Sequence, residues 1–449
     1  MTRHTTTNRR VLTRHAAAIF IAMLFAPAFA EMPLIEATRA DDTETLRQLI
    51  SSGAAIDAAD SDGFTALHWA ATTGNAAITR ELIAAGADIE KRGPRGETPL
   101  ILAAAGGDDD TVRLLLERGA RVERTLGTGQ NALHVAAGRG NTGIARLLLA
   151  AGIPVDEATE NSKSTALHLA AGAGATDIVN LLLDKGAKID RPDIFSNTAL
   201  LLATTSDQRE TISALVSRGA RLNAKSETGA GLIHVAAANG NTDFVRLLME
   251  NGIKINQRHG NRTTPLHWAA LGGHVQTATF LVANGANIDA LSESRDTPLH
   301  AAAINGNEDV IGLLLQNGAK LNARALDSAT PLVRALDNKN VAAAALMIEA
   351  GSDISERGQN GATVLQRAVI SGSFAMVEML LDMELDPNAA DEDGDTALHY
   401  AAFFGHVDIA SRLLAAGADK SAVNRGGFTA AALARRAGHE DVAAILQSS

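Results

Sequence analysis

The sequence contains no cysteine, and aromatic residues make up only 3% of its 449 residues. Without cysteine the chain forms no disulfide and carries no lipid anchor on a cysteine. The absence also suits an exported protein, since a free thiol is a liability in an oxidising compartment. Few aromatic side chains and abundant alanine favour closely packed helices over the large mixed core of an enzyme. The sequence also lacks the Gly-x-Ser-x-Gly, phosphate-loop, His-Glu-x-x-His and dinucleotide-binding motifs. We therefore expect no enzyme activity and no cofactor.

Residues 1–30 form a segment of their own. The first 15 residues carry four arginines and no acid, the next ten are apolar, and Ala28-Phe29-Ala30 has the small-x-small form of a cleavage site. This order is typical of a secretory signal peptide, and we expect cleavage after Ala30. The alternative is an uncleaved membrane anchor. The apolar run of 15 residues includes Pro27, however, and a spanning helix needs about 20. We expect a periplasmic or secreted protein, with no membrane insertion after signal removal.

Acidic residues outnumber basic ones, and the formal charge of the chain is −11. Removal of residues 1–30 takes away four arginines and no acid, so the charge becomes −15. Phosphate backbones and anionic lipid surfaces repel a protein this acidic. We therefore expect no nucleic-acid partner.

One phrase, Thr-x-Leu-His-x-Ala-Ala, recurs along the chain. It occupies residues 65–71, 165–171, 264–270, 297–303 and 396–402, with Pro in the second position of two copies. The slot that its histidine occupies falls at residues 68, 101, 134, 168, 201, 234, 267, 300, 333, 366, 399 and 432. Every step is 33 residues except one of 34, whose extra residue lies in residues 157–164. Self-similarity at such a period indicates a solenoid, in which each unit buries its apolar face against its neighbours.

Each repeat contains the signals for two short helices. In residues 60–87, Gly63 suits a turn, Thr65 is placed to cap a first helix, and Gly74 to end it. Gly86 is placed to end a second helix in the left-handed conformation. The first and last units carry extra charge, as terminal caps require.

Through these aligned copies the chain resembles the ankyrin-repeat family over nearly all of residues 31–449. The resemblance implies an all-α solenoid of about 13 repeats including caps, in which paired antiparallel helices are joined by short β-hairpin or turn tips. We expect a single continuous array over residues 31–449, and a monomer. The resemblance also implies a non-catalytic scaffold that binds a protein partner on its concave face. The alternatives are a secreted host-directed effector and a structural tether of cell-envelope components.

Seven histidines share the repeating slot and raise the question of a metal array. Identical slots in neighbouring repeats lie about 8–10 Å apart, whereas the ligands of one zinc ion each lie near 2.1 Å from it. We therefore interpret these histidines as structural groups that bond loop backbone, and we expect no metal site. The acidic runs at 391–395 and 108–110 fit a tip and a helix start, with weak calcium binding as the alternative.

Aromatic residues gather near one presumed open groove. Tyr400, Phe403 and Phe404 fall within five residues at a first helix, in a chain of only 14 aromatics. This density predicts an anchor for a partner; the alternative is that the phenylalanines pack against a neighbouring repeat. Phe195 lies on a tip and is a further candidate. Trp268 and the equivalent Trp69 share the slot of Tyr400, and we interpret both as packing residues.

Two consecutive tips are basic in this acidic chain. One carries Arg221 and Lys225, and the next carries Arg258 and Arg262. We expect these four residues to steer a partner, with ordinary surface charge as the alternative.

Three repeats depart from the glycine pattern. Asp207 and Lys339 replace the glycine between the two helices, and Glu384 replaces the glycine that ends a second helix. A non-glycine residue held left-handed costs about 1 kcal/mol, so we expect these repeats to open more readily.

Overall fold

The computed structural model describes residues 32–447; the predicted signal peptide lies outside them. The described residues form 26 α-helices and two compact units, which adjoin in sequence between Asn161 and Ser162. We call residues 32–161 the N-terminal unit and residues 162–447 the C-terminal unit. The division falls within the tip that contains the extra residue. That the two units form one continuous array remains a prediction.

The N-terminal unit contains four helix pairs. They are α2 (Pro33–Arg39) and α3 (Thr43–Ser51), α4 (Ala66–Thr73) and α5 (Ala76–Ala84), α6 (Pro99–Gly106) and α7 (Asp109–Glu117), and α8 (Ala132–Arg139) and α9 (Thr142–Ala150).

The C-terminal unit contains nine helix pairs. They are α10 (Ala166–Ala173) and α11 (Thr176–Asp184), α12 (Ala199–Thr205) and α13 (Arg209–Ser217), α14 (Leu232–Ala238) and α15 (Thr242–Glu250), α16 (Pro265–Gly272) and α17 (Val275–Ala283), α18 (Pro298–Asn305) and α19 (Glu308–Gln316), α20 (Pro331–Asp337) and α21 (Val341–Glu349), α22 (Val364–Ser371) and α23 (Phe374–Asp382), α24 (Ala397–Phe404) and α25 (Val407–Ala415), and α26 (Ala430–Ala437) and α27 (Glu440–Gln447). The two sets make 13 pairs, which confirms the predicted all-α repeat architecture.

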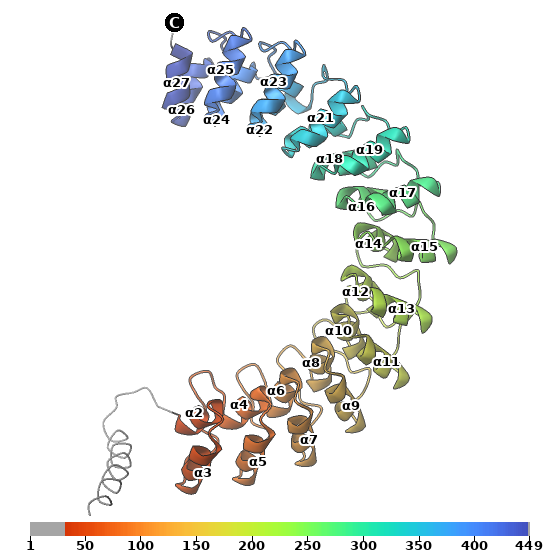
Figure 1. The fold of residues 1–449 in the computed structure, drawn as a ribbon, viewed down its shortest axis with the longest axis vertical. Coiled ribbons are helices and arrows are strands. Elements are labelled where there is room, and N and C mark those ends of the chain that lie inside the picture. Colours follow the sequence, from red (N-terminus) through yellow and green to blue (C-terminus); the bar gives the residue numbers. More distant parts are fainter. Residues whose placement is uncertain (1–31, 448–449) are drawn as a thin grey trace, which may run out of the picture. The chain divides into compact units, whose positions relative to one another are not determined.

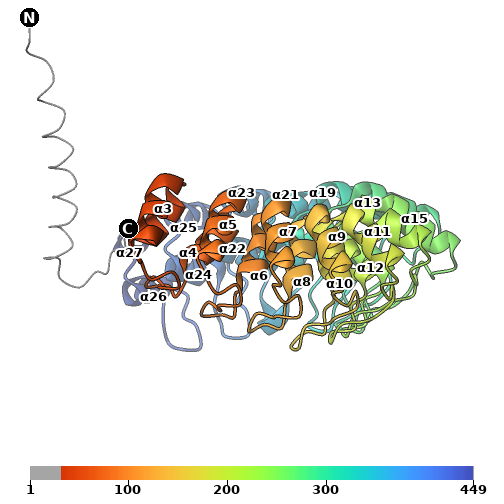
Figure 2. The ribbon, with the colours of Figure 1, turned by 90° about the horizontal axis from the view of Figure 1, so that it is seen from below.

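Within each unit the even-numbered first helices and the odd-numbered second helices form two layers (Figure 1). The tips between repeats project on the side of the first helices (Figure 2). In the C-terminal unit the first helices lie on the inner side of a curve, which we call its concave face.

The helices begin and end where the local chemistry predicts. The Thr65 hydroxyl accepts the His68 N–H at the start of α4, and Gly74 ends that helix at φ 70°. Proline occupies the first turn of α6, α16, α18 and α20, where its missing N–H removes no helical hydrogen bond.

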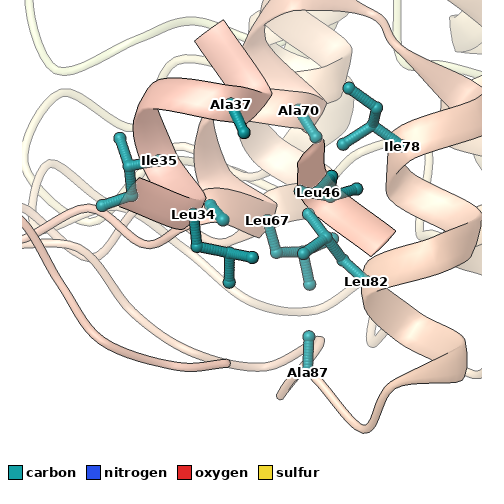
Figure 3. Close-up of a cluster of buried hydrophobic side chains, with 10 residues drawn as sticks. Leu34, Ile35, Ala37, Leu46, Leu67, Ala70, Ile78, Leu82 and Ala87 are labelled. Carbon is teal, nitrogen blue, oxygen red and sulfur yellow. The ribbon is translucent and has the colours of Figure 1, made fainter. Parts of the chain in front are cut away.

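Small apolar residues from successive pairs form the core, as Figure 3 shows for the first two pairs. Leu34 and Leu46 of α2 and α3 meet Leu67 of α4 and Leu82 of α5, and all four are buried. Burial of each leucine stabilises the fold by about 1.5–3 kcal/mol. Ala70 lies beside them and lets the helices approach closely. Each pair thus completes its core only against the next pair.

The tips are turns rather than extended hairpins. In the described residues, β-structure is limited to isolated antiparallel bridges, such as the one between Lys225 and Gly231. Backbone hydrogen bonds also join consecutive tips: the Leu326 N–H donates to the Ser294 carbonyl at 2.8 Å. Equivalent bonds run from Gly127 to Arg95, from Ile194 to Ser162, from Glu227 to Phe195, from Glu293 to Asn261, from Glu392 to Asn360 and from Arg425 to Asp393. The tips therefore support one another.

Several residues other than glycine adopt the left-handed conformation. Asp207, Lys339 and Glu384 have φ values of 49°, 63° and 61°, as the glycine pattern predicts for their positions. Five further left-handed residues sit in the tip slot that glycine fills elsewhere, and all five belong to the C-terminal unit: Lys163, Ser196, Arg262, Arg295 and Ser328. Each such residue carries backbone strain on the order of 1 kcal/mol.

Candidate functional site

Exposed apolar side chains mark one face of the C-terminal unit. Within residues 32–447, eleven large apolar side chains are exposed, and every one follows residue 193. Nine of them lie on tips or first helices: Ile194, Phe195, Leu271, Leu291, Leu326, Ile370, Phe403, Phe404 and Val423. The other two, Phe374 and Met383, lie at the ends of α23. This distribution makes the concave face the candidate site.

Phe403 and Phe404 end helix α24 as an exposed aromatic pair. Their side chains are 52% and 42% exposed, and their ring centroids lie 5.1 Å apart in an edge-to-face arrangement. Phe404 also stacks on His406, with ring centroids 6.0 Å apart. Neither phenylalanine is buried against a neighbouring repeat, so both are available as anchors.

Tyr400 has a different environment from these two rings. It is half-buried, and its hydroxyl donates to Asp391 Oδ2 at 2.6 Å. Asp391 Oδ1 also accepts the N–H groups of Asp393 and Asp395. Burial, then the bond to Asp391, raises the pKa of Tyr400. The Tyr400 side chain therefore links helix α24 to the tip that precedes it.

Phe195 lies on the tip before α12 and is 51% exposed, beside exposed Ile194. The Phe195 carbonyl accepts the N–H of Glu227 in the next tip at 3.0 Å. The ring thus projects from a tip whose backbone is held in place.

The four predicted basic residues are all exposed but differ in their contacts. Arg221 lies 3.4 Å from the Asp190 carboxylate, which offsets its charge. Lys225, Arg258 and Arg262 form no ion pair among residues 32–447. The uncompensated positive charge therefore centres on the tip before α16.

A pocket that the sequence did not predict lies beside this tip. It has a volume of about 620 Å³ and is formed by helices α16 and α18 and three consecutive tips. Its apolar lining comprises Trp268, Leu271, Ala301, Ile304 and Leu326. Leu326 and Leu271 are 66% and 43% exposed, so the pocket opens to solvent.

The pocket exists because one slot holds a small residue. The position after the repeating histidine holds Trp268 in α16, but the same slot in α18 holds Ala301. Elsewhere this slot is filled by larger side chains: Trp69, Leu102, Val135, Leu169, Leu202, Val235, Arg334, Arg367, Tyr400 and Leu433. This outlier is the one sequence signal that could have located the pocket.

The histidines of the repeating slot bond loop backbone, as predicted. His267 Nδ1 accepts the Thr264 N–H at 3.1 Å, and its Nε2–H donates to the Asp296 carbonyl of the next tip at 3.0 Å. Burial lowers the pKa of His234 and of His267 to about 4. These imidazoles therefore stay neutral near pH 7 and link each helix to the following tip. Gln366 fills the slot in α22 and makes the same bonds to Thr363 and Asp395.

No metal-ligand cluster was found in the described part of the chain. Between residues 32 and 447, none of the helices combines the length and apolarity needed to cross a membrane.

Comparison with known proteins places these repeats in a family. A model described as "Ankyrin repeats (3 copies)" matches residues 34–126, 74–159, 123–193, 157–226, 192–259 and 233–325, and a model described as "Ankyrin repeats (many copies)" matches residues 365–414. Among solved structures, the crystal structure of the human ASB11 ankyrin repeat domain is similar at 26% identity and a TM-score of 0.44. The similarity covers 48% of this chain and 98% of that one. A search of curated proteins found no match. Because the two models together match well over half of its residues, the chain belongs to the ankyrin-repeat family.

Proposed function

We propose that this protein is an exported, non-catalytic scaffold that binds a protein partner on the concave face of its C-terminal unit, in the periplasm or outside the cell. Ankyrin repeats are protein-interaction modules, and solenoids of this kind offer extended concave binding surfaces. The observation that carries the proposal is the placement of nine of the eleven exposed large apolar side chains on tips and first helices. Exposed apolar groups gathered on one face are typical of an interaction surface.

Export is supported by the sequence of residues 1–30 alone. We expect the mature protein to begin at Glu31, because the apolar run before it is too short to span a membrane. N-terminal sequencing of the native protein tests this, and a sequence beginning at Met1 would contradict it. Fractionation then separates the locations: a periplasmic protein is released by osmotic shock, and a secreted effector is found in the medium.

The binding face is tested with a photo-crosslinking residue placed in the native cell envelope. Position 403 probes the concave face, and position 374, an exposed phenylalanine at the start of second helix α23, is the matched control. We expect position 403 to crosslink a discrete protein, identified by mass spectrometry, and position 374 to yield none. Equal crosslinking at both positions would contradict binding of the partner at the concave face.

A further inference from the structure

We propose that the pocket between α16 and α18 receives a bulky apolar side chain from an acidic segment of the partner protein. This inference rests on the proposed scaffold function and names the chemistry that the scaffold recognises. It depends on three features of the C-terminal unit: the shape of the pocket, the bonds that hold it open and the charges beside it.

The pocket has the shape and lining that an apolar side chain requires. Ala301 leaves empty the volume that a large residue fills in most other repeats, while Trp268 and Leu271 of α16 line it together with Ile304 of α18. Leu326 contributes from the following tip and is 66% exposed. A leucine or phenylalanine from a partner would cover these groups and remove their apolar surface from water.

Bonds within the unit hold the pocket in this form. Trp268 Nε1–H donates to Thr263 Oγ1 at 2.9 Å, and the indole ring meets His259 edge-on, with ring centroids 5.4 Å apart. The next tip is tied to the preceding one by the bond from the Glu293 N–H to the Asn261 carbonyl at 2.8 Å. A preformed pocket loses little conformational entropy on binding, which favours affinity.

Positive charge beside the pocket points to an acidic partner segment. Arg258, Arg262 and Arg295 are exposed and form no ion pair among the described residues. Arg262 lies between the lining residues Asn261 and Thr263, and Arg295 lies likewise between Ser294 and Asp296.

The acids near the pocket compensate this charge only in part. Asp296 is bound by Arg334, which also pairs with Asp327. Glu293 is the remaining lining acid and has no ion pair in the described residues. Arg334 and the three exposed arginines carry four positive charges, whereas Glu293, Asp296 and Asp327 carry three negative charges. The site therefore has a net charge of +1 in a chain whose overall charge is negative. An acidic segment is attracted to this site and a basic one is repelled.

The two left-handed arginines also suggest a spacing. Arg262 and Arg295 occupy equivalent positions in consecutive repeats, which stack about 10 Å apart. About three residues of an extended chain cover that distance. The segment should therefore carry acidic residues roughly three positions apart around its apolar residue.

The test is a substitution that fills the pocket with a leucine, a side chain that occupies the same slot in other repeats of this chain. Ala301→Leu introduces the residue found in the same slot at Leu102, Leu169 and Leu202, and Val235→Leu is the matched control in a repeat outside the pocket. Random twelve-residue peptides displayed on phage are selected on the purified wild-type protein. The enriched peptides are then synthesised and measured on all three proteins by fluorescence anisotropy.

We expect enriched peptides to contain a large apolar residue with flanking Asp or Glu, and to bind Ala301→Leu at least about tenfold more weakly. Their affinity for Val235→Leu should be unchanged. Equal affinity for Ala301→Leu, enrichment of basic peptides or no enrichment would each overturn the proposal. Wild-type protein that dimerises, while Ala301→Leu stays monomeric in sedimentation velocity, would identify a second copy as the occupant and also overturn it.

A second variant tests the charges without disturbing the backbone. Arg262→Asn with Arg295→Asn removes both charges and keeps a residue type that tolerates the left-handed conformation. Ser328→Asn, in the same slot of the next repeat, is the neutral control. We expect the double variant to slow association at low salt about tenfold and the control to leave it unchanged. Unchanged association of the double variant would contradict the acidic assignment.

The two proposals fail separately. If crosslinking at position 403 still captures a partner while Ala301→Leu binds every selected peptide normally, the scaffold function stands and the pocket proposal fails. If crosslinking captures nothing while the peptides still distinguish Ala301→Leu, the pocket binds but the proposed partner site at α24 fails.

Discussion

Trp69 and Trp268 occupy the same slot, one in each unit, and their surroundings differ. Trp69 bonds to Asp60 through its Nε1–H, and the Arg39 guanidinium lies 3.7 Å from its ring centroid, so a cation covers the ring. Trp268 donates instead to Thr263 Oγ1, because His259 stands where Asp60 does in the earlier repeat, and its ring lines an open pocket. The same slot of the repeat therefore holds a tryptophan covered by an arginine in the N-terminal unit and a tryptophan that lines a pocket in the C-terminal unit.

The same contrast holds across the two units. In the N-terminal unit the left-handed tip slot holds Gly63, Gly96 and Gly129, and no exposed large apolar side chain was found among residues 32–161. The C-terminal unit holds five strained residues in that slot and all eleven exposed apolar side chains. Strain retained beside exposed apolar groups is typical of functional surfaces. The residues that recur in every repeat therefore determine the fold. Positions where the C-terminal unit differs from the repeat pattern accompany the candidate binding surface.

We expect the largest difference between the two units in their loss of stability as the pH falls. Five slot histidines lie in the C-terminal unit and two in the N-terminal unit. The folded pKa of His234 and of His267, about 4, lies below the ordinary 6.5, so their stabilising contribution is complete above about pH 6.5 and is lost as the pH falls toward 4. Each contributes up to about 3 kcal/mol. We expect hydrogen exchange to show the C-terminal unit opening first as the pH falls.

The control for this prediction comes from the chain itself. His267→Gln copies Gln366, which makes the same hydrogen bonds and does not titrate. It should flatten the dependence of the unfolding free energy on pH between 6.5 and 4. An unchanged pH profile would show that His267 is not the titrating group.

Alanine substitutions at two tip glycines distinguish the cost of a left-handed backbone from the cost of a steric clash. Gly129 and Gly427 have φ values of 82° and 78°. A Cβ at Gly129 would lie 2.6 Å from the backbone nitrogen of Glu160, whereas a Cβ at Gly427 meets nothing within 4 Å. We expect Gly129→Ala to destabilise by about 2–4 kcal/mol and Gly427→Ala by about 1 kcal/mol in urea denaturation. Equal losses would mean that the tip before α8 shifts freely to admit a side chain.

The aromatic pair is tested against its equivalent in the N-terminal unit. Phe403→Ser with Phe404→Ser should raise the dissociation rate of the crosslinked partner by about 10- to 100-fold, because two exposed rings lose their contacts. Thr72→Ser with Thr73→Ser changes the same two slots of α4 and should leave the rate unchanged. Surface plasmon resonance measures both. Normal dissociation from a folded phenylalanine variant would remove this pair from the site.

The smallest expected effect concerns the glycine that ends a second helix. Glu384→Gly relieves the left-handed strain at φ 61° and should stabilise the protein by up to about 1 kcal/mol. Gly119→Glu is the reciprocal change in the N-terminal unit; it meets no atom within 4 Å of its Cβ and should destabilise by a similar amount. The denaturant midpoint measures both, at constant slope. A lower midpoint for Glu384→Gly would reveal a compensating contact of the glutamate.

Much of the fold follows from short-range signals. Thr65, Gly74 and Gly86 mark helix starts and ends because caps and left-handed turns depend on atoms within a few residues. The strain at Glu384 was predicted for the same reason. The sequence drew attention to Phe403 and Phe404 but left open whether they pack against a neighbouring repeat, and the structure shows both to be exposed.

Other features were decided only by residues about one repeat apart. The ion pair of Arg221 with Asp190 and the cover that Arg39 gives to Trp69 each join side chains that the repeat period does not specify. The pocket is the clearest case, since Ala301 becomes a cavity only where Trp268 and Leu326 lie beside it. The sequence by itself determined the period, the helices and the left-handed turns, because these depend on local hydrogen bonding and backbone sterics. The tertiary structure decided which surfaces stay open, because that depends on which side chains the stacking of repeats brings together.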